Sequence, residues 1–103
     1  MNIIRSKKFT SDIPWDSIEI ANMDGITTHL HWTNKAYKWH TNEGDEVFVV
    51  LDGQVKMLYR VNGEKTSVLL NEGDIFYATE GVEHVAHPVG EARVLVIEKE
   101  GSV

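Results

Sequence analysis

The sequence predicts an all-β domain built as a sandwich or a barrel of short antiparallel strands. Apolar residues recur mostly with a period of two, which is typical of strands, and no segment shows a clear helical period. Turn sequences such as Asn62-Gly63 cut the chain into short runs. At 103 residues the chain is long enough to close one hydrophobic core and too short for a second. We therefore expect one domain.

The first 25 residues are the least regular part of the chain. We interpret residues 1–25 as an N-terminal arm that packs on the rest of the protein or on a dimer partner, and residues 26–100 as the β domain. Within residues 11–17, Pro14 either begins a turn of helix or holds an extended segment.

Two later runs are apolar on both faces. In residues 46–51 the face that carries Glu46, Phe48 and Val50 alternates with a second apolar face, and residues 94–99 behave likewise. A small barrel has only one interior, so something must cover its outside. The cover is either the arm, through Ile13, Trp15, Ile18 and Ile20, or a second copy of the chain. We expect a homodimer, and a second sheet stacked on the first is the alternative.

A regular strand and hairpin follow. Residues 54–61 alternate, with Val55, Met57 and Tyr59 on one face. Asn62-Gly63 comes directly after them and is among the strongest signals for a two-residue hairpin turn. A further strand is expected over residues 75–78.

Polar residues able to bind a metal stand at the ends of these strands. His40 and Asn42 share a face if their segment is extended, and the chain then reverses into Glu46, which lies close to them across the hairpin. His84 supplies a second imidazole from another strand. Two histidines and one carboxylate form a ligand set that leaves positions open for water or substrate. A hydrogen-bonded polar cluster without metal is the alternative interpretation.

These residues give the chain a resemblance to small single-domain cupins. The first cupin motif, roughly G-x5-H-x-H-x3-E-x6-G, is matched by His40, Glu46 and Gly53, and the second, roughly G-x5-P-x-G-x2-H-x3-N, by Gly73, Gly81 and His84. The Trp39-His40 start and the run DEVFVVLDG also resemble the short members called mannose-6-phosphate isomerase-like.

The resemblance implies a double-stranded β-helix of jelly-roll type, so that residues 26–100 form the cupin barrel. It also implies a divalent metal held by His40, Glu46 and His84, and Fe, Mn, Ni, Zn and Cu all occur in such sites. Asn42 replaces the second histidine of the first motif. An amide oxygen is a weaker ligand than imidazole, so Asn42 is either a weak fourth ligand or none.

Other side chains have plainer interpretations. We expect core or pocket-lining positions for Phe48, Val50, Met57, Tyr59 and Phe76. His29 and His31 share a face and could form a second metal pair, although such pairs more often line a sheet surface. His87 should lie on the face opposite His84, at the surface or an interface.

Composition narrows the classes of function. The net charge is −6 and the ten Lys and Arg residues are scattered, which argues against a nucleic-acid partner. The absence of cysteine excludes thiolate zinc sites, and no apolar run approaches a membrane span, so a cytoplasmic protein is expected. The sequence predicts either a metal-dependent enzyme of isomerase or oxygenase type acting on a small molecule, or a metal-free module that binds or senses a small ligand.

Overall fold

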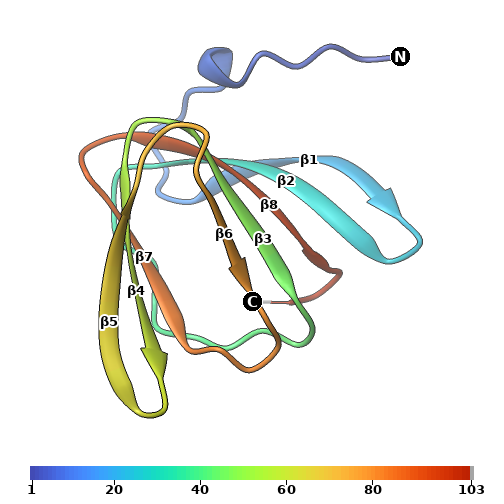
Figure 1. Ribbon diagram of the computed structural model, residues 1–103. Helices are drawn as coiled ribbons and strands as arrows, with labels where there is room; N and C mark the ends of the chain where they lie inside the picture. The colour runs from blue at the N-terminus through green and yellow to red at the C-terminus, as the bar shows by residue number, and fades with distance from the viewer. Residues whose placement is uncertain (103) are drawn as a thin grey trace.

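The structure, a computed structural model, describes residues 1–102 as two antiparallel sheets (Figure 1). In chain order the elements are a short 3-10 helix η1 (Ser6–Lys8), β1 (Asp16–Met23), β2 (Ile26–Thr33), β3 (Glu46–Asp52), β4 (Val55–Val61), β5 (Glu64–Leu70), β6 (Ile75–Ala78), β7 (His84–Pro88) and β8 (Ala92–Lys99). Among residues 1–102 no helix is long and apolar enough to cross a membrane.

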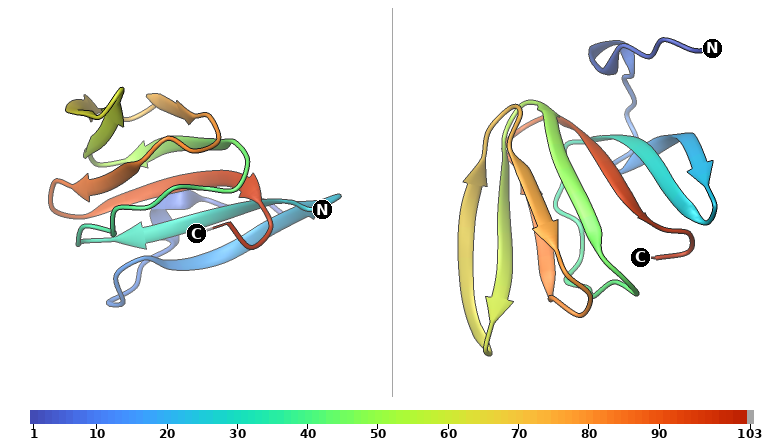
Figure 2. Two further views of the ribbon diagram at one scale, coloured as in Figure 1. Left: turned by 90° about the horizontal axis from the view of Figure 1, so that it is seen from below. Right: turned by 45° about the vertical axis from the view of Figure 1, so that its right-hand side comes forward.

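The strand order places sequence-distant segments side by side. The larger sheet runs β1-β2-β8-β3-β6 and the smaller sheet runs β5-β4-β7. In Figure 2 the strands β4 and β5 lie at one side of the molecule and β1 and β2 at the other, with β3 and β8 between them. The predicted all-β class and the jelly-roll arrangement are confirmed.

The hairpin predicted at Asn62-Gly63 is confirmed. Strands β4 and β5 pair in the register Val61↔Glu64, which leaves a two-residue turn. Both turn residues have positive φ, 52° at Asn62 and 79° at Gly63, as a type I′ turn requires. The turn follows the right-handed twist of the two strands, which explains why this dipeptide predicted the element well.

The N-terminal segment differs from the sequence-based expectation. Of the two alternatives for residues 11–17, the turn of helix is wrong, because the only 3-10 turn found within residues 1–102 is η1. The Ser11 hydroxyl instead bonds Asp16 Oδ2 (2.8 Å) and accepts the Ile13 backbone N–H (3.0 Å), a local turn that competes with helix. Trp15 then adopts a positive φ of 62°, and the chain enters β1, which pairs with β2 at the sheet edge.

One buried arginine anchors the first residues to the outer face of the larger sheet. Arg93 in β8 is 6% exposed, and it donates from Nε to the Phe9 carbonyl (2.7 Å) and from Nη2 to the Thr10 hydroxyl (3.1 Å). Its Nη1 forms an ion pair with Asp52 at 2.7 Å. These contacts all lie at one end of the outer face. Residues 9 and 10 are therefore held at that end and cover only part of the outer surface of β3 and β8.

The hydrophobic core lies between the two sheets. Its buried members are Phe48, Val50, Val55, Met57, Leu70, Ala86, Ala92, Val94 and Val96. On β3 the inward residues are Glu46, Phe48 and Val50, as the alternation predicted. Glu46 therefore stands at the end of a strand whose next inward residues are core, and this places a carboxylate where the space between the sheets opens.

Gly53 ends β3 in a place where no side chain fits. Its φ is +82°, and a Cβ would lie 2.5 Å from the Glu91 carbonyl oxygen. Gly63 has a similar φ of +79° with nothing within 4 Å of a Cβ. We expect Gly63→Ala to lower the free energy of unfolding by about 1 kcal/mol through backbone strain alone. Gly53→Ala should lower it by roughly 2 to 4 kcal/mol, because strain and a backbone clash combine. Urea denaturation of both variants checks this, and equal losses would contradict it.

Candidate metal centre

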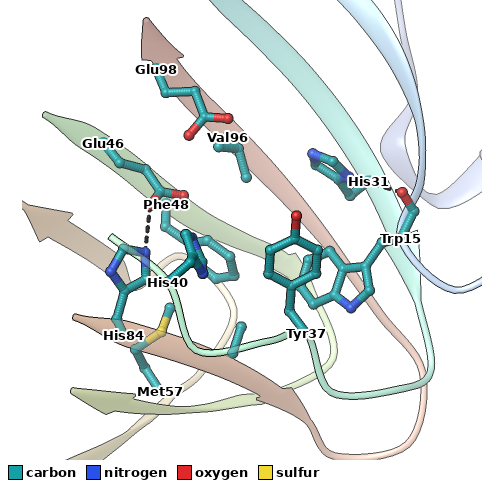
Figure 3. A pocket seen from close by; sticks show the side chains of 11 residues that line it. Trp15, His31, Tyr37, His40, Glu46, Phe48, Met57, His84, Val96 and Glu98 are labelled. Carbon is teal, nitrogen blue, oxygen red and sulfur yellow. Dashed lines mark hydrogen bonds and ion pairs between the residues drawn. The ribbon is translucent and has the colours of Figure 1, made fainter. Parts of the chain in front are cut away.

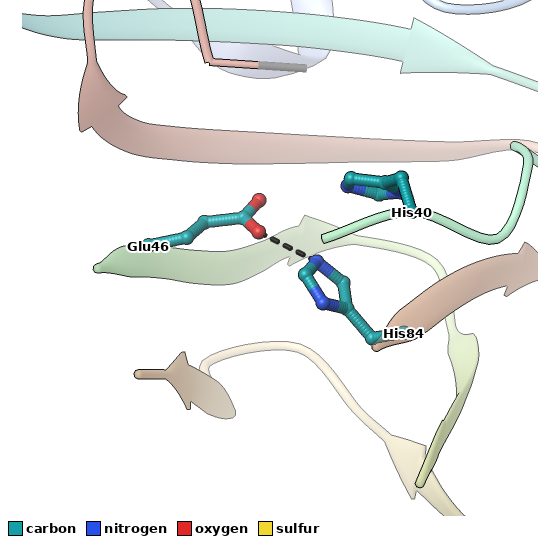
Figure 4. A group of neighbouring side chains, drawn as sticks. All are labelled: His40, Glu46 and His84. Atoms are coloured by element: carbon teal, nitrogen blue, oxygen red, sulfur yellow. Dashed lines mark hydrogen bonds and ion pairs between the residues drawn. The ribbon is translucent and has the colours of Figure 1, made fainter. Parts of the chain in front are cut away.

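His40, Glu46 and His84 converge at one end of the space between the sheets (Figure 4). Each offers one ligand atom, and these atoms all lie within 4.8 Å of one another. Glu46 is the first residue of β3, His84 is the first residue of β7, and His40 comes from the loop that precedes β3. The three residues named as ligands from the sequence are thus brought together.

The loop that carries His40 does not run where the sequence suggested. The hairpin expected between residues 36–42 and Glu46 is wrong, because both edges of β3 are already paired, with β6 and with β8. His40 lies instead beside β7, where its N–H donates to the His84 carbonyl (3.2 Å) and its carbonyl accepts the His84 N–H (3.1 Å). This isolated bridge fixes the two backbones so that the imidazole centroids are 4.4 Å apart.

Both imidazoles are oriented by a backbone carbonyl. His40 Nδ1 lies 2.8 Å from the Lys38 carbonyl oxygen, and His84 Nδ1 lies 2.8 Å from the Val82 carbonyl oxygen. A carbonyl can only accept, so each Nδ1 carries the proton and donates it. The remaining nitrogen, Nε2, is thereby left for the site. Metal-binding histidines in proteins are typically held in this way.

Glu46 forms a buried ion pair with His84. Glu46 Oε1 accepts from His84 Nε2 at 2.7 Å, with the two residues 5% and 2% exposed. Burial acts to lower the pKa of His84, but the hydrogen bond and charge of Glu46, helped by the Val82 carbonyl, outweigh it and raise that pKa above 6.5. Burial lowers the pKa of His40, and the neighbouring His84 lowers it further. The cluster therefore favours the protonated form of His84 and the neutral form of His40.

Asn42 sits behind the carboxylate and does not line the pocket. Its Nδ2 donates to Glu46 Oε1 at 2.6 Å. Its Oδ1 is buried and has no hydrogen-bond partner within residues 1–102. Asn42 thus contacts the carboxylate ligand directly, in the manner of residues that orient metal ligands.

Removing that contact should loosen the site. We expect Asn42→Ala to weaken metal binding by about 10-fold or more, because such orienting partners typically contribute 10- to 100-fold in affinity. Asn34→Ala, at an exposed loop position, is the control and should leave affinity unchanged. Calorimetric titration with Zn²⁺ measures both. An unchanged dissociation constant in Asn42→Ala would contradict an orienting role.

A cavity of about 130 Å³ adjoins the three side chains (Figure 3). It is lined by Trp15, His31, Tyr37, His40, Glu46, Phe48, Met57, His84, Ala86, Val96 and Glu98. Of the residues expected from the sequence to line a pocket, Phe48 and Met57 do so. The cavity is much smaller than the range of about 300 to 1,000 Å³ that is usual for drug-sized ligands. It suits a small molecule.

Three other expected lining residues lie in the core instead. Val50 is fully buried because it is one inward step deeper on β3 than Phe48. Tyr59 and Phe76 pack on the core cluster with ring centroids 5.4 Å apart. Phe76 also lies 5.9 Å from the His84 ring, so these aromatic side chains support the imidazole from behind rather than facing a ligand.

Trp15 lies inside the pocket, although the sequence suggested that it covers the outside of the barrel. Its left-handed backbone turns the side chain inward, and its indole N–H donates to the Lys35 carbonyl at 2.9 Å. Its ring meets those of His31 and Tyr37 edge-on, with centroids 5.7 and 5.2 Å away. A bulky residue at positive φ is a genuine outlier that surrounding contacts must hold in place. No pattern in the sequence signals that conformation.

His31 and Glu98 also line the pocket, and neither was expected there: His31 was considered only as a possible metal partner of His29, and the structure does not place it among the metal-ligating group. Both could have been found, because His31 alternates with Leu30 and Trp32, and Glu98 shares a strand face with Val94 and Val96. Burial and the charge of Glu46, its cross-strand neighbour, raise the pKa of Glu98 from 4.5 to about 7.

The remaining polar residues named from the sequence stand outside the cavity. His29 forms an ion pair with Glu19 (3.9 Å) and does not join the metal ligands. His87 is exposed on the opposite face of β7 from His84, as the alternation predicted.

Comparison with known proteins agrees with this architecture. The family model Cupin_2, the cupin domain, matches residues 28–98. A cupin-2 domain protein from Shewanella frigidimarina is similar in structure, with a TM-score of 0.77 at 25% identity over 87% of this chain and 85% of the other. A protein from Neisseria meningitidis has a TM-score of 0.71 at 22% identity, over 87% and 88% of the two chains. No curated protein matches the chain.

A hydroquinone 1,2-dioxygenase in complex with Cd²⁺ and 4-hydroxybenzonitrile is also similar, with a TM-score of 0.74 at 15% identity over 93% of this chain and 69% of the other. At that identity the likeness concerns the fold alone. The family model covers well over half of the sequence, and its span contains all three converging side chains. The chain belongs to the Cupin_2 family of cupin domains.

Proposed function

We propose that this protein binds a divalent transition metal through His40, Glu46 and His84 and holds a small organic molecule in the adjoining pocket. One observation carries the proposal. Two imidazoles whose Nδ1 atoms are committed to backbone carbonyls present Nε2 beside one buried carboxylate. Two nitrogen ligands and one oxygen ligand are a set that first-row transition metals accept with positions left open.

The chain's own residues define what such a site does. His40, Glu46 and His84 would hold the metal, and the metal when bound would supply Lewis acidity or, if redox-active, oxygen chemistry. The aromatic rings of Trp15 and Tyr37 line the pocket, and the Tyr37 ring meets that of His40 edge-on with centroids 5.1 Å apart. The similar dioxygenase shows only that this fold can carry a reaction of oxygenase type, one of the two that such a metal would support. The resemblance to mannose-6-phosphate isomerase-like cupins supports an isomerase.

Metal analysis of wild-type protein purified without chelators tests the proposal. We expect about one metal ion per chain, and loss of most of it in His40→Ala, because three ligands are the minimum of this set. His29→Ala is the matched control, since His29 pairs with Glu19 outside the site. Metal retained by His40→Ala, or lost equally in His29→Ala, would refute the assignment.

A metal-free ligand-binding module is the second candidate. The observation that favours it is the short hydrogen bond between Glu46 Oε1 and His84 Nε2, which satisfies both groups without any metal. Native mass spectrometry separates the two candidates. A chain that carries a small organic molecule and no metal supports the second, and a metal adduct supports the first.

We further propose that the protein is a homodimer. One cross-strand row of the larger sheet's outer face is apolar throughout and consists of Ile18, Leu30, Leu95, Val49 and Ile75. Its two ends are exposed, 39% at Ile18 and 64% at Ile75. Light scattering should give twice the monomer mass for wild type and a monomer for Ile75→Lys, because a charge in an apolar contact is costly. A monomeric wild-type protein at micromolar concentration would overturn this proposal.

A further inference from the structure

The pocket has a second polar wall that the three metal-ligand residues do not use. It consists of His31 on β2, Tyr37 in the loop before β3, and Glu98 on β8. Figure 3 shows all three side chains bordering the same space, with Glu98 beside Glu46 and with His31 and Tyr37 on the side away from His84. Within residues 1–102 the group of mutually close metal-ligating atoms contains only His40, Glu46 and His84, so Glu98 is not among them although it is the cross-strand neighbour of Glu46.

Two polar groups of this wall, the Glu98 carboxyl group and the Tyr37 hydroxyl, are not used by the protein. Burial and the charges of Glu46 and His84 act on the pKa of Glu98. Its carboxyl group has no hydrogen-bond partner among the described residues. The Tyr37 hydroxyl likewise experiences only burial and the charges of Glu98 and Glu46. A partly buried acceptor and a partly buried hydroxyl without protein partners are groups that a ligand can satisfy.

His31 adds a further acceptor. Its Nδ1 lies 3.3 Å from the Trp15 carbonyl oxygen and must donate to it, because a carbonyl only accepts. Burial keeps the pKa of His31 below 6.5, so the ring is neutral at pH 7 and its Nε2 carries a lone pair. In Figure 3 the edge of this ring away from Trp15 faces the side where Glu98 lies. The wall therefore presents two acceptors and one hydroxyl.

The rest of the pocket limits the body of the ligand. Apart from the metal ligands and the polar wall, the lining is mostly apolar, with Trp15, Phe48, Met57 and Val96. The volume is about 130 Å³. An apolar cavity of about 150 Å³ is large enough to hold benzene. The space therefore suits one ring, with a polar group at each end.

We propose that the pocket binds a small single-ring molecule that places a hydroxyl or amino donor against Glu98, Tyr37 and His31, while an oxygen at its other end faces the metal ligands. A ligand with a second carboxylate is disfavoured, because it would meet the Glu98 carboxyl group and the His31 lone pair, and only the Tyr37 hydroxyl could donate to it. This inference rests on the proposed function for the orientation of the ligand. The polar wall itself does not depend on the metal.

Three para-substituted phenols that differ only at one end test the wall. They are 4-aminophenol, 4-methylphenol and 4-hydroxybenzoate, titrated calorimetrically under argon into protein loaded with Zn²⁺ at pH 8.5, where Glu98, with a pKa of about 7, is ionised. We expect 4-aminophenol to bind about tenfold more tightly than 4-methylphenol, the effect of one hydrogen bond to a charged acceptor, and 4-hydroxybenzoate to bind most weakly. Equal affinities, tightest binding of 4-hydroxybenzoate, or no binding of any of the three overturns the proposal.

Two variants test whether the wall causes the preference for 4-aminophenol. Glu98→Gln should raise the affinity for 4-hydroxybenzoate, relative to that for 4-methylphenol, by about tenfold, because a negative charge that repels the carboxylate is removed. Tyr37→Phe should reduce the preference for 4-aminophenol. Glu64→Gln, exposed at the β4–β5 turn, is the control and should change neither. A wall that only supports the fold would lower affinity for all three phenols alike, and that result overturns the proposal.

Zinc content separates this inference from the proposed function. Glu98→Gln and Tyr37→Phe should bind as much Zn²⁺ as wild type, and loss of zinc in Glu98→Gln would make Glu98 a metal ligand and refute the wall. If wild type binds no Zn²⁺, the proposed function fails. The same titrations on the metal-free chain then decide the wall alone, since a retained preference supports it and equal affinities overturn it.

Discussion

Replacing His84 by alanine should destabilise the metal-free protein by roughly 3 to 5 kcal/mol, the usual cost of leaving one member of a buried ion pair without its partner. Glu46 is only 5% exposed and would keep just the Asn42 amide as a hydrogen-bond donor. The variant would also lose the ring contacts of His84 with His40 and Phe76. Urea denaturation of both proteins without metal measures the difference.

The same variant should bind no metal. His84 supplies one of three ligands, so its loss removes both an attachment point and part of the arrangement that holds Glu46. His87→Ala is a matched control on the same strand, because His87 is exposed on the opposite face of β7. A His84→Ala protein that unfolds at the urea concentration of wild type would show that the ion pair is not a buried, stabilising contact.

Metal affinity and metal-free stability should depend on pH in opposite directions. The raised pKa of His84 means that protons compete with the metal, so affinity should fall as the pH is lowered from 7.5 to 5.5, by about tenfold per pH unit once the pH is below that pKa. Competition titrations with a chromophoric chelator at several pH values measure this. An affinity that does not change over that range would show that no ligand must lose a proton.

The stability of the metal-free protein should fall above pH 6.5. The folded-state pKa of His84 is raised, so its contribution is complete below the unfolded value of 6.5 and is lost as pH rises through the folded value. Glu98, raised from 4.5 to about 7, acts in the same direction, because the folded state keeps that proton longer than the unfolded chain does. The lowered pKa values of His31 and His40 favour folding as pH rises, but that gain is complete by about pH 6.5.

Melting temperatures measured between pH 6 and 9 in the presence of a chelator check that direction. A melting temperature that increases through this range would contradict the raised pKa values. With saturating metal the decline should weaken, because a bound ligand stabilises the folded state by mass action and affinity rises with pH.

Local chemistry explains which parts of the fold could be predicted from the sequence. The hairpin at Asn62-Gly63 and the inward faces of β3 and β4 follow from turn preferences and from the period of two, both of which act between near neighbours. The position of residues 34–45 could not be predicted that way. It depends on which strand edges remain free after the whole sheet has formed, and both edges of β3 are occupied.

The residues of the site likewise fall into those that the sequence could predict and those that it could not. The convergence of His40, Glu46 and His84 was expected from motif spacing, and residues on regular strands, such as His31 and Glu98, could have been added from their alternation. Trp15 and Tyr37 could not, because each reaches the pocket from irregular backbone. Trp15 depends on a left-handed conformation that tertiary contacts impose, and no local preference favours it.

The most direct test of the metal site is an anomalous-scattering measurement on crystals grown with Mn²⁺, with data recorded at a wavelength where manganese scatters anomalously. We expect a single peak at about 2.0 to 2.3 Å from Nε2 of His40, Nε2 of His84 and a carboxylate oxygen of Glu46, the usual range for such ligands. We also expect the hydrogen bond between Glu46 and His84 to be broken. A peak elsewhere, or an intact hydrogen bond with no peak at saturating metal, would contradict it.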